Sequence, residues 1–306
     1  TQEPTMQPSY VDRINRAIDH VLAHLGSPVR LDEVAAVAGL SPFHFHRIFH
    51  HSTGESLARF VTRLRLERAL RLLIHDRSAM VGEVALSCGF ASASHFIHAF
   101  KRRYGQAPGR FDREAWRAER REELTRSMAE SGSGYRLDRL PAGENPDGFV
   151  ARIRQLPPRK VAYVRVFEPF RPGRVEQAAA RLQAWALERG LADGQWLGYM
   201  WDDPDCVPLS DCRYDVGLQV PEGVGSEGEI GLIEFPSMSI ACLPVRGDIS
   251  LEQRALDWLF GTWLPASGRV PADQPVFEAW VGRPFAFGTA HFELDLHLPL
   301  RSTRLV

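Results

Sequence analysis

The chain has 306 residues, of which 44% are apolar and 25% charged, and its formal net charge is −1. This length allows two or three domains with their own cores. No apolar run approaches the roughly 20 residues that span a bilayer, and the first thirty residues contain no signal-peptide core, so we expect a cytoplasmic protein without a membrane partner. Residues 1–124 hold 18 Lys and Arg against 14 Asp and Glu, and residues 125–306 hold 19 against 24. This split favours a polyanion-binding domain joined to a domain with another partner.

The first part of the chain is predicted to be helical, because apolar residues recur there at helical spacing between glycine and proline signals. The expected helices cover residues 10–25, 31–38, 42–51, 56–73, 80–87, 92–104 and 114–124.

One pattern appears twice among these helices. Val34-Ala35 leads to Gly39-Leu40-Ser41, and Val84-Ala85 leads to Gly89-Phe90 and then Ser92. Each copy predicts a short helix, a glycine turn, an N-cap serine and a second helix, which is a helix-turn-helix. Two such units on one chain can read two stretches of DNA.

The second half of the chain predicts strands and two helices, also in two copies. Ile153 to Val164 matches Leu232 to Leu243, and the helical patterns of 176–189 and 251–264 correspond. We align Tyr199 with Glu278 in the strands that follow. Neither copy can bury a sheet alone, so we expect one pseudo-symmetric α+β domain with a central cleft.

The expected fold class is therefore an all-α double helix-turn-helix domain followed by a duplicated strand-helix-strand-strand domain. We expect the boundaries to be 1–124 for the first domain, 125–148 for a linker rich in Ser, Gly and Pro, and 149–306 for the second domain. A lead-in strand around 135–140 is the alternative for part of the linker.

We expect neither a cofactor nor a metal site from the sequence. Its four cysteines lie at positions 88, 206, 212 and 242, without Cys-x-x-Cys spacing. Free thiols are favoured over a redox pair of Cys206 and Cys212.

The N-terminal third resembles the DNA-binding domain of AraC-family transcription regulators. The resemblance rests on the two repeated units, on Arg65 to Leu73 between them, and on Phe100-Lys101-Arg102 with Gly105 and Pro108 after them. It implies that one long helix holds both recognition helices in successive major-groove segments.

The residues expected to contact DNA lie on the outer faces of the two recognition helices. Arg47 suits guanine, Phe43 a thymine methyl, and the capped helix starts suit phosphate. His98 stands where many members of the family have Arg. We therefore expect the second helix-turn-helix to bind the DNA backbone more than it reads bases. The full expected set is Ser41, Phe43, His46, Arg47, Ser92, Ala93, Ser94, His98, Lys101 and Arg102.

Residues 149–306 resemble the GyrI-like small-molecule-binding domain. The resemblance rests on the duplicated strands, on Gly198-Tyr199 with Asp202-Asp203-Pro204, and on Phe277-Glu278. It implies a cleft in which Glu278 faces an aromatic, cationic ligand. We expect Tyr199 and Glu278 to flank this cleft symmetrically. The expected ligand-binding set is Tyr163, Tyr199, Trp201, Tyr214, Phe235, Trp258, Glu278 and Trp280. The alternative for Glu278 is a structural salt bridge to Arg165 or Arg246.

These observations predict a non-enzymatic transcription regulator controlled by a small effector. The resemblance implies activation, with duplex DNA, the effector and RNA polymerase as partners. The alternatives are a small-molecule hydrolase with Glu278 as general base and a regulator whose cleft binds nothing.

Overall fold

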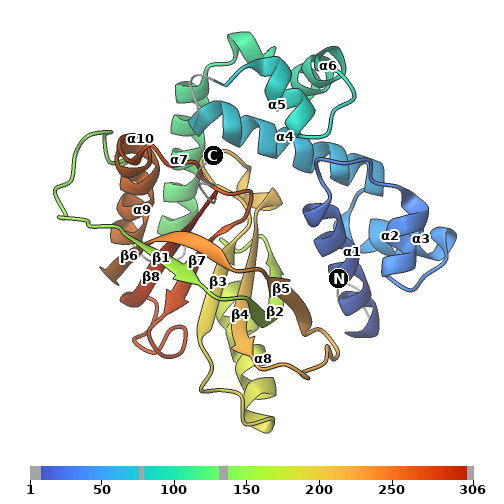
Figure 1. The fold of residues 1–306 in the computed structure, drawn as a ribbon, viewed down its shortest axis with the longest axis vertical. Coiled ribbons are helices and arrows are strands. Elements are labelled where there is room, and N and C mark those ends of the chain that lie inside the picture. The colour runs from blue at the N-terminus through green and yellow to red at the C-terminus, as the bar shows by residue number, and fades with distance from the viewer. Residues whose placement is uncertain (1–7, 76–78, 131–136, 302–306) are drawn as a thin grey trace. The chain divides into compact units, whose positions relative to one another are not determined.

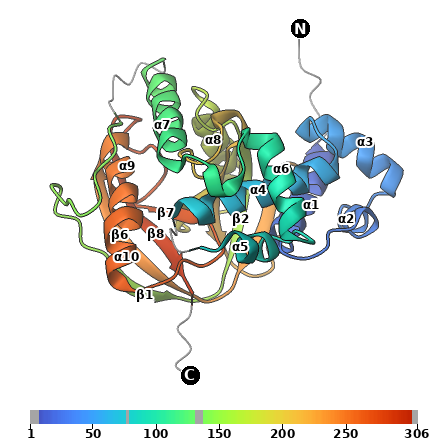
Figure 2. The same ribbon diagram turned by 90° about the horizontal axis from the view of Figure 1, so that it is seen from above.

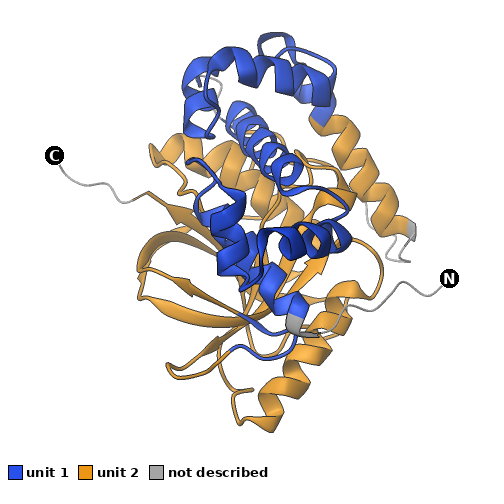
Figure 3. Cartoon of the chain, turned by 90° about the vertical axis from the view of Figure 1, so that its right-hand side faces the viewer, with its two compact units in different colours: residues 1–116, 226–231 blue, residues 117–225, 232–306 orange. Residues whose placement is uncertain are grey.

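The computed structural model describes residues 8–75, 79–130 and 137–301. The chain divides into two compact units, one of residues 1–116 with 226–231 and the other of 117–225 with 232–306 (Figure 3). We expected the first domain to extend to residue 124. The division instead falls within a helix.

The regular elements of residues 8–116 are all helices, as predicted (Figure 1). Its elements are α1 (Pro8–Ala23), α2 (Leu31–Val37), α3 (Pro42–Thr53), α4 (Leu57–His75), α5 (Val81–Ser87), α6 (Ala93–Tyr104) and the start of α7 (Arg113–Glu130). The expected helices are confirmed within a few residues, except that α7 runs on to Glu130.

The recognition helices begin where their cap residues predict. The Ser41 hydroxyl accepts a hydrogen bond from the His44 amide at 3.4 Å, and Ser92 accepts one from the His95 amide at 3.2 Å. The turn at Gly89 has φ +82°, and a Cβ there would lie 2.6 Å from the Leu25 carbonyl. Glycine is therefore required at position 89 for the second helix-turn-helix to pack against the end of the first helix region at Leu25.

The second unit contains two copies, and in each the predicted strand-helix-strand-strand order is preceded by one further strand. The first copy contains β1 (Arg152–Leu156), β2 (Arg159–Phe167), α8 (Arg174–Glu188), β3 (Trp196–Met200) and β4 (Arg213–Val220). The second copy contains β5 (Gly231–Phe235), β6 (Met238–Gly247), α9 (Ile249–Trp258), β7 (Val276–Trp280) and β8 (Phe292–Leu300). A π-helical turn (Leu259–Trp263) and α10 (Leu264–Ser267) extend α9.

The eight strands form one sheet in the order β1-β6-β8-β7-β3-β4-β2-β5. The copies exchange their first strands: β1 pairs with β6, and β5 lies beside β2. Five strands separate β1 from β2 in this order, yet two residues, Pro157 and Pro158, connect them. A flat sheet would need about 29 Å there, and two residues reach only about 10 Å, so the sheet must curl until its ends meet.

The curled sheet has an inner face and an outer face. The inner face is filled by an apolar cluster that includes Val161, Tyr199, Phe235, Met238 and Phe277. The outer face carries α8, packed on β2 and β4, and α9, packed on β6. In Figures 1 and 2, α7 lies beside α9.

The stretch expected to be a linker is largely structured. Residues 125–130 belong to α7, and Leu137 and Leu140 are buried. The alternative strand at 135–140 lies partly outside the described residues, and 137–140 form no strand.

Candidate functional site

The outer face of α3 is free to meet another molecule. Phe43 is 69% exposed, and His46 and Arg47 are exposed beside it, while Phe45 and Phe49 are fully buried on the opposite face. The ring of Phe43 thus lies on the face of α3 that the core does not use. The expectation that Phe43, His46 and Arg47 point outward agrees with this arrangement.

The outer face of α6 is more basic. Ser94, His98, Lys101 and Arg102 are exposed, Ala93 is half-buried, and Phe96 and Phe100 fill the core side. Within the described ranges, Lys101 and Arg102 form no ion pair with a carboxylate. Their charges are therefore available to phosphate groups, and Ser92, which caps the helix, stands at its amide end.

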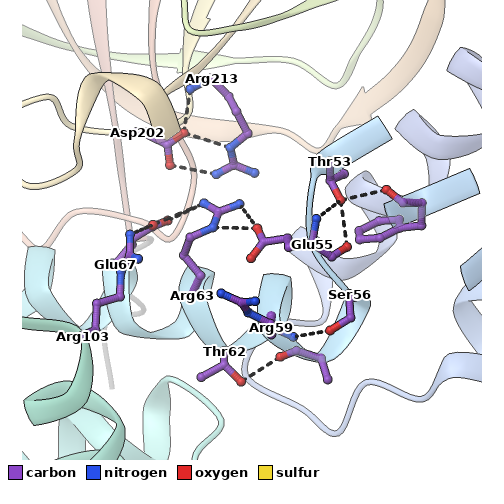
Figure 4. Close-up of polar contacts among 12 residues, drawn as sticks. Thr53, Glu55, Ser56, Arg59, Thr62, Arg63, Glu67, Arg103, Asp202 and Arg213 are labelled. Atoms are coloured by element: carbon purple, nitrogen blue, oxygen red, sulfur yellow. Dashed lines mark hydrogen bonds and ion pairs between the residues drawn. The ribbon is translucent and has the colours of Figure 1, made fainter. Parts of the chain in front are cut away.

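A partly buried charge network connects the two helix-turn-helix units. Arg63 Nε donates to Glu55 Oε1 at 2.8 Å and Arg63 Nη1 to Glu67 Oε1 at 3.2 Å, while Arg103 Nη2 of α6 reaches the same oxygen at 3.4 Å (Figure 4). Glu55 follows α3, Arg63 and Glu67 lie on α4, and Arg103 lies in the last turn of α6. The network thus fixes both recognition helices on the central helix. Sequence reasoning missed it, although Arg63 and Glu67 have the i, i+4 spacing of a helical ion pair.

Glu278 of β7 lies on the outer face of the sheet and is 5% exposed. The Tyr214 hydroxyl of β4 donates a 2.6 Å hydrogen bond to Glu278 Oε2. Gly198 of β3 lies between them, and a Cβ at that position would stand 1.8 Å from the Tyr214 oxygen and 2.5 Å from Glu278 Oε2. The missing side chain of Gly198 is what allows this pair to form.

A second buried carboxylate belongs to the same site. Glu252 of α9 is 4% exposed and lies near enough to Glu278 for the two carboxyl groups to interact electrostatically. Burial raises the pKa of Glu278 to about 7, although the hydrogen bond from Tyr214 opposes the shift. Burial and the charge of Glu278 raise the pKa of Glu252 well above its usual range. Both carboxyl groups therefore hold their protons to a higher pH than free carboxyl groups do, and an incoming cation would favour their ionised forms.

The structural alternative for Glu278 is wrong. Arg165 forms a two-pronged ion pair with Asp215 at 2.9 and 2.7 Å. Arg246 reaches Asp295 at 3.2 Å. In the part of the chain that is described, no arginine pairs with Glu278, and a buried carboxylate without a cation is uncommon.

The eight expected ligand residues do not share one cleft. Tyr163, Tyr199, Trp201 and Phe235 belong to the inner face, where the rings of Tyr199 and Phe235 stack with centroids 4.7 Å apart. Tyr214, Glu278 and Trp280 belong to the outer face, because alternate residues of a strand point in opposite directions. Trp258 is on α9, against Phe149.

The expected symmetry of Tyr199 and Glu278 is therefore wrong. The register pairs Gly198 with Glu278 and Tyr199 with Phe277 at the junction of the two copies. The equivalent of Glu278 is thus Gly198, 80 positions earlier, whereas β1 and β5 begin 79 positions apart. One additional residue in the second copy shifts β7, and a shift of one residue reverses the face of every side chain.

The inner face contains a cation of its own. Arg159 is buried, its Nε donates to the Tyr199 hydroxyl at 3.2 Å, and its guanidinium lies over the rings of Phe277 and Phe235 at 4.6 and 5.1 Å. The inner aromatic residues are therefore already packed around a guanidinium.

All four cysteines are buried, and none of them forms a disulfide. Ligand atoms of Cys242, Asp295 and His297 lie within 4.8 Å of one another. Arg152 stands opposite Cys242 on β1, and burial with the charges of nearby arginines lowers the pKa of His297 to about 4. This positive field disfavours a divalent cation.

Among the described helices, none has the length and apolar character needed to cross a membrane.

Two family comparisons match the chain. Residues 34–114 match a helix-turn-helix domain, and residues 151–301 match the GyrI-like small molecule binding domain.

Individual relatives match the two parts separately. The chain is 32% identical over 111 residues to the bifunctional transcriptional activator/DNA repair enzyme AdaA of Bacillus subtilis (strain 168), a match that covers 36% of this chain and 51% of that protein. It thus spans about half the length of that relative. It is 31% identical over 154 residues to the DNA gyrase inhibitor of Serratia proteamaculans (strain 568), covering 49% of this chain and 96% of that protein.

A solved structure matches the first unit. The DNA-binding domain of AdpA, crystallised with a target DNA, is 30% identical with a TM-score of 0.32, and the match covers 35% of this chain and 96% of that one.

Proposed function

The chain belongs to the AraC-type helix-turn-helix regulators and carries a GyrI-like small-molecule-binding domain, and on that premise we propose that it activates transcription when a small aromatic cation occupies the second domain. Its partners are duplex DNA, the effector and RNA polymerase, and it acts in the cytoplasm, where the DNA is. Activation is supported by the relative AdaA, which is by name a transcriptional activator. We assign DNA binding to residues 1–124 and effector binding to 149–306.

The observation that supports DNA reading is the pair of capped helices with exposed outer faces. Phe43 and Arg47 stand beside His46 on α3, and His98, Lys101 and Arg102 stand together on α6. Ser41 and Ser92 offer helix N-termini to phosphate, and Ala93 and Ser94 lie in the first turn of α6. The first helix reads bases, and the second chiefly holds the backbone.

Selection of genomic DNA fragments by the full chain tests this assignment. We expect one enriched sequence with two half-sites. Transcription from a promoter that contains it, with purified RNA polymerase, should rise when the protein is added. Failure to enrich any sequence would remove the proposal, and a fall in transcription would replace activation by repression.

The observation that supports effector binding is the buried Glu278 without an arginine partner. Glu278 is surrounded by the Tyr214 phenol, the Glu252 carboxyl group and the end of β7 that carries Trp280. The Trp280 ring packs on the rings of Phe285 and Phe292, with centroids 5.3 and 5.6 Å apart. Carboxylates among aromatic rings suit a flat organic cation through charge pairing and cation–π contact. Of the expected ligand residues, we assign Tyr214, Glu278 and Trp280 to this site, which is also bordered by Glu252.

Calorimetric titration with 1-methylquinolinium and with neutral quinoline at pH 8 tests the ligand class. Glu278→Gln should lower the affinity for the cation at least about tenfold and change that for quinoline little, because it removes charge and keeps shape. Glu234→Gln, the same change at an exposed residue of the same unit, is the matched control. Equal weakening of both ligands would make Glu278 structural.

A hydrolase is the second candidate, because a carboxyl group with a pKa of about 7 suits a general base. We propose that the chain is not an enzyme, because ligand binding in the second unit can control the DNA-binding unit to which it is fused. Mass spectrometry of a bound electrophilic aromatic ester after long incubation separates the two. Turnover that Glu278→Gln abolishes would favour the hydrolase.

A further inference from the structure

Helix α7 contains one of the points at which the chain passes from the first unit to the second. It begins at Arg113 and runs without a break to Glu130. From Arg117 onward it belongs to the second unit, and the residues before that belong to the first (Figure 3). What holds residues 117–130 in the second unit therefore bears on how the units communicate.

Arg121 fastens α7 with four charged hydrogen bonds. Its Nε and Nη2 donate to the two oxygens of Asp205 at 2.8 and 2.9 Å. Its Nη2 and Nη1 also donate to the two oxygens of Asp257 at 2.8 and 3.2 Å, and Nη1 reaches the Leu137 carbonyl at 3.3 Å. Arg121 is 7% exposed, so little solvent competes for these bonds.

The two aspartates come from different copies of the repeat. Asp205 lies between β3 and β4 of the first copy, and Asp257 lies on α9 of the second. Asp205 has a further partner in Arg117 at 3.4 Å, and Asp257 also accepts the Leu140 amide at 3.0 Å. Burial opposes the charge of Arg121, but the aspartates outweigh it and raise its pKa, so the residue stays a cation.

Helix α9 reaches from this network to the proposed ligand site. Glu252, which interacts electrostatically with Glu278, precedes Asp257 on the same helix by about 7.5 Å of helical rise. A ligand that takes a proton from Glu252 or pushes its side chain aside acts on the helix that holds Asp257. A helix moves as a body, because its hydrogen bonds resist local extension.

We propose that Arg121 is a positioning residue that couples the ligand site to DNA binding: a cation beside Glu252 and Glu278 shifts α9, and the Asp257–Arg121 pair passes the shift to α7 and so to the first unit. The inference rests on the proposed function. Asp205 keeps α7 attached to the first copy throughout, so the second copy moves relative to a fixed anchor. Arg121 touches neither ligand nor DNA.

The first experiment measures coupling in the full chain. DNA affinity is determined with and without saturating 1-methylquinolinium, and the ratio is the coupling factor, which for linked sites is about 5–150. Asp257→Asn retains the Arg121–Asp205 pair and an acceptor for the Leu140 amide. We expect its coupling factor to fall to about 1, with DNA affinity and ligand affinity each within about threefold of wild type. Arg126→Met, at an exposed position of the same helix, should leave the factor unchanged.

An unchanged coupling factor in Asp257→Asn would overturn the proposal. Loss of ligand affinity itself would also overturn it, because Asp257 would then belong to the ligand site. Arg121→Lys provides the conservative comparison: it keeps the charge and loses the planar fork, and we expect it to retain part of the coupling.

Hydrogen exchange in the free protein tests the connection without any ligand. Asp257→Asn should accelerate amide exchange in both α9 and α7, and at β7 beside Glu252. Acceleration in α9 alone would overturn the coupling path even if the effector class were right. Failure of 1-methylquinolinium to bind wild type would instead count against the proposed effector class, and the exchange result would still decide the path.

Discussion

Tyr214 and Glu278 form a 2.6 Å hydrogen bond across β3, directly over the one residue there that has no side chain, Gly198. The pair joins the two copies of the repeat, because Tyr214 belongs to β4 and Glu278 to β7. It also lies under α9, which supplies Glu252. The site is thus assembled from both copies and depends on the absence of a methyl group.

We predict that Gly198→Ala destabilises the second unit by about 1–3 kcal/mol, the usual cost of overpacking a core. The new Cβ would collide with the Tyr214 oxygen and with Glu278 Oε2. Urea unfolding measures the change. Gly225→Ala has nothing within 4 Å of its Cβ and serves as control, with an expected effect below about 0.5 kcal/mol. Equal effects at both positions would contradict the crowding argument.

The raised pKa of Glu278 makes a prediction about pH. Its folded pKa of about 7 exceeds its ordinary value of 4.5, so the folded state binds more protons between these values. The stability contributed by this group is fully present below pH 4.5 and is lost as the pH rises through 7, with a slope of at most about 1.4 kcal/mol per pH unit.

Subtracting the free energy of unfolding of Glu278→Gln from that of wild type isolates this contribution. His297, whose pKa is lowered, has the opposite slope between pH 4 and 6.5 and cancels in the difference. The free energy of unfolding of wild type minus that of the variant should decline between pH 5 and 8. A difference that rises with pH would show that Glu278 is ionised at neutral pH.

Cation binding should release protons, because the bound cation favours ionised carboxylates. Calorimetry in two buffers of different ionisation enthalpy at pH 6.5 measures the number released. We expect a positive number for 1-methylquinolinium and none for quinoline. In Glu252→Gln the release should fall, since one titrating group is gone, and an unchanged number would exclude Glu252 from the site.

The two recognition helices should respond differently to substitution. Arg47→Ala should cost about 1–3 kcal/mol on the selected site and relax the preference for one base pair. Lys101→Ala should weaken binding to all sequences alike and reduce the salt slope by about one. His98→Ala should cost less than Arg47→Ala. Equal loss of specificity at both half-sites would contradict this asymmetry.

Glu67 should matter to the first unit although it faces no DNA. Glu67→Gln removes the charge that Arg63 and Arg103 share, and we expect a loss of about 1.5–3 kcal/mol in thermal unfolding. Glu33→Gln removes an exposed partner of Arg30 and should cost less than about 1 kcal/mol. Similar losses in both variants would mean that the network contributes no more than a surface pair.

The sequence predicted well whatever depends on neighbouring residues. Ser41, Pro42 and Ser92 start helices by local hydrogen bonding and fixed φ, so α3 and α6 begin where expected. The face of Glu278 depended instead on one extra residue between β6 and β7, which only the pairing reveals. Arg121 and Asp257 lie 136 positions apart, and no local pattern marks such a pair.

The exchange of β1 and β5 between the copies has a consequence for how this domain is made. Each copy completes its sheet only with a strand from the other, so a chain cut between β4 and β5 would yield two fragments with unpaired edges. Mixed together, the fragments should restore the sheet as a complex, and neither should fold alone. The two copies therefore depend on each other for folding in the way that the subunits of an intertwined dimer do.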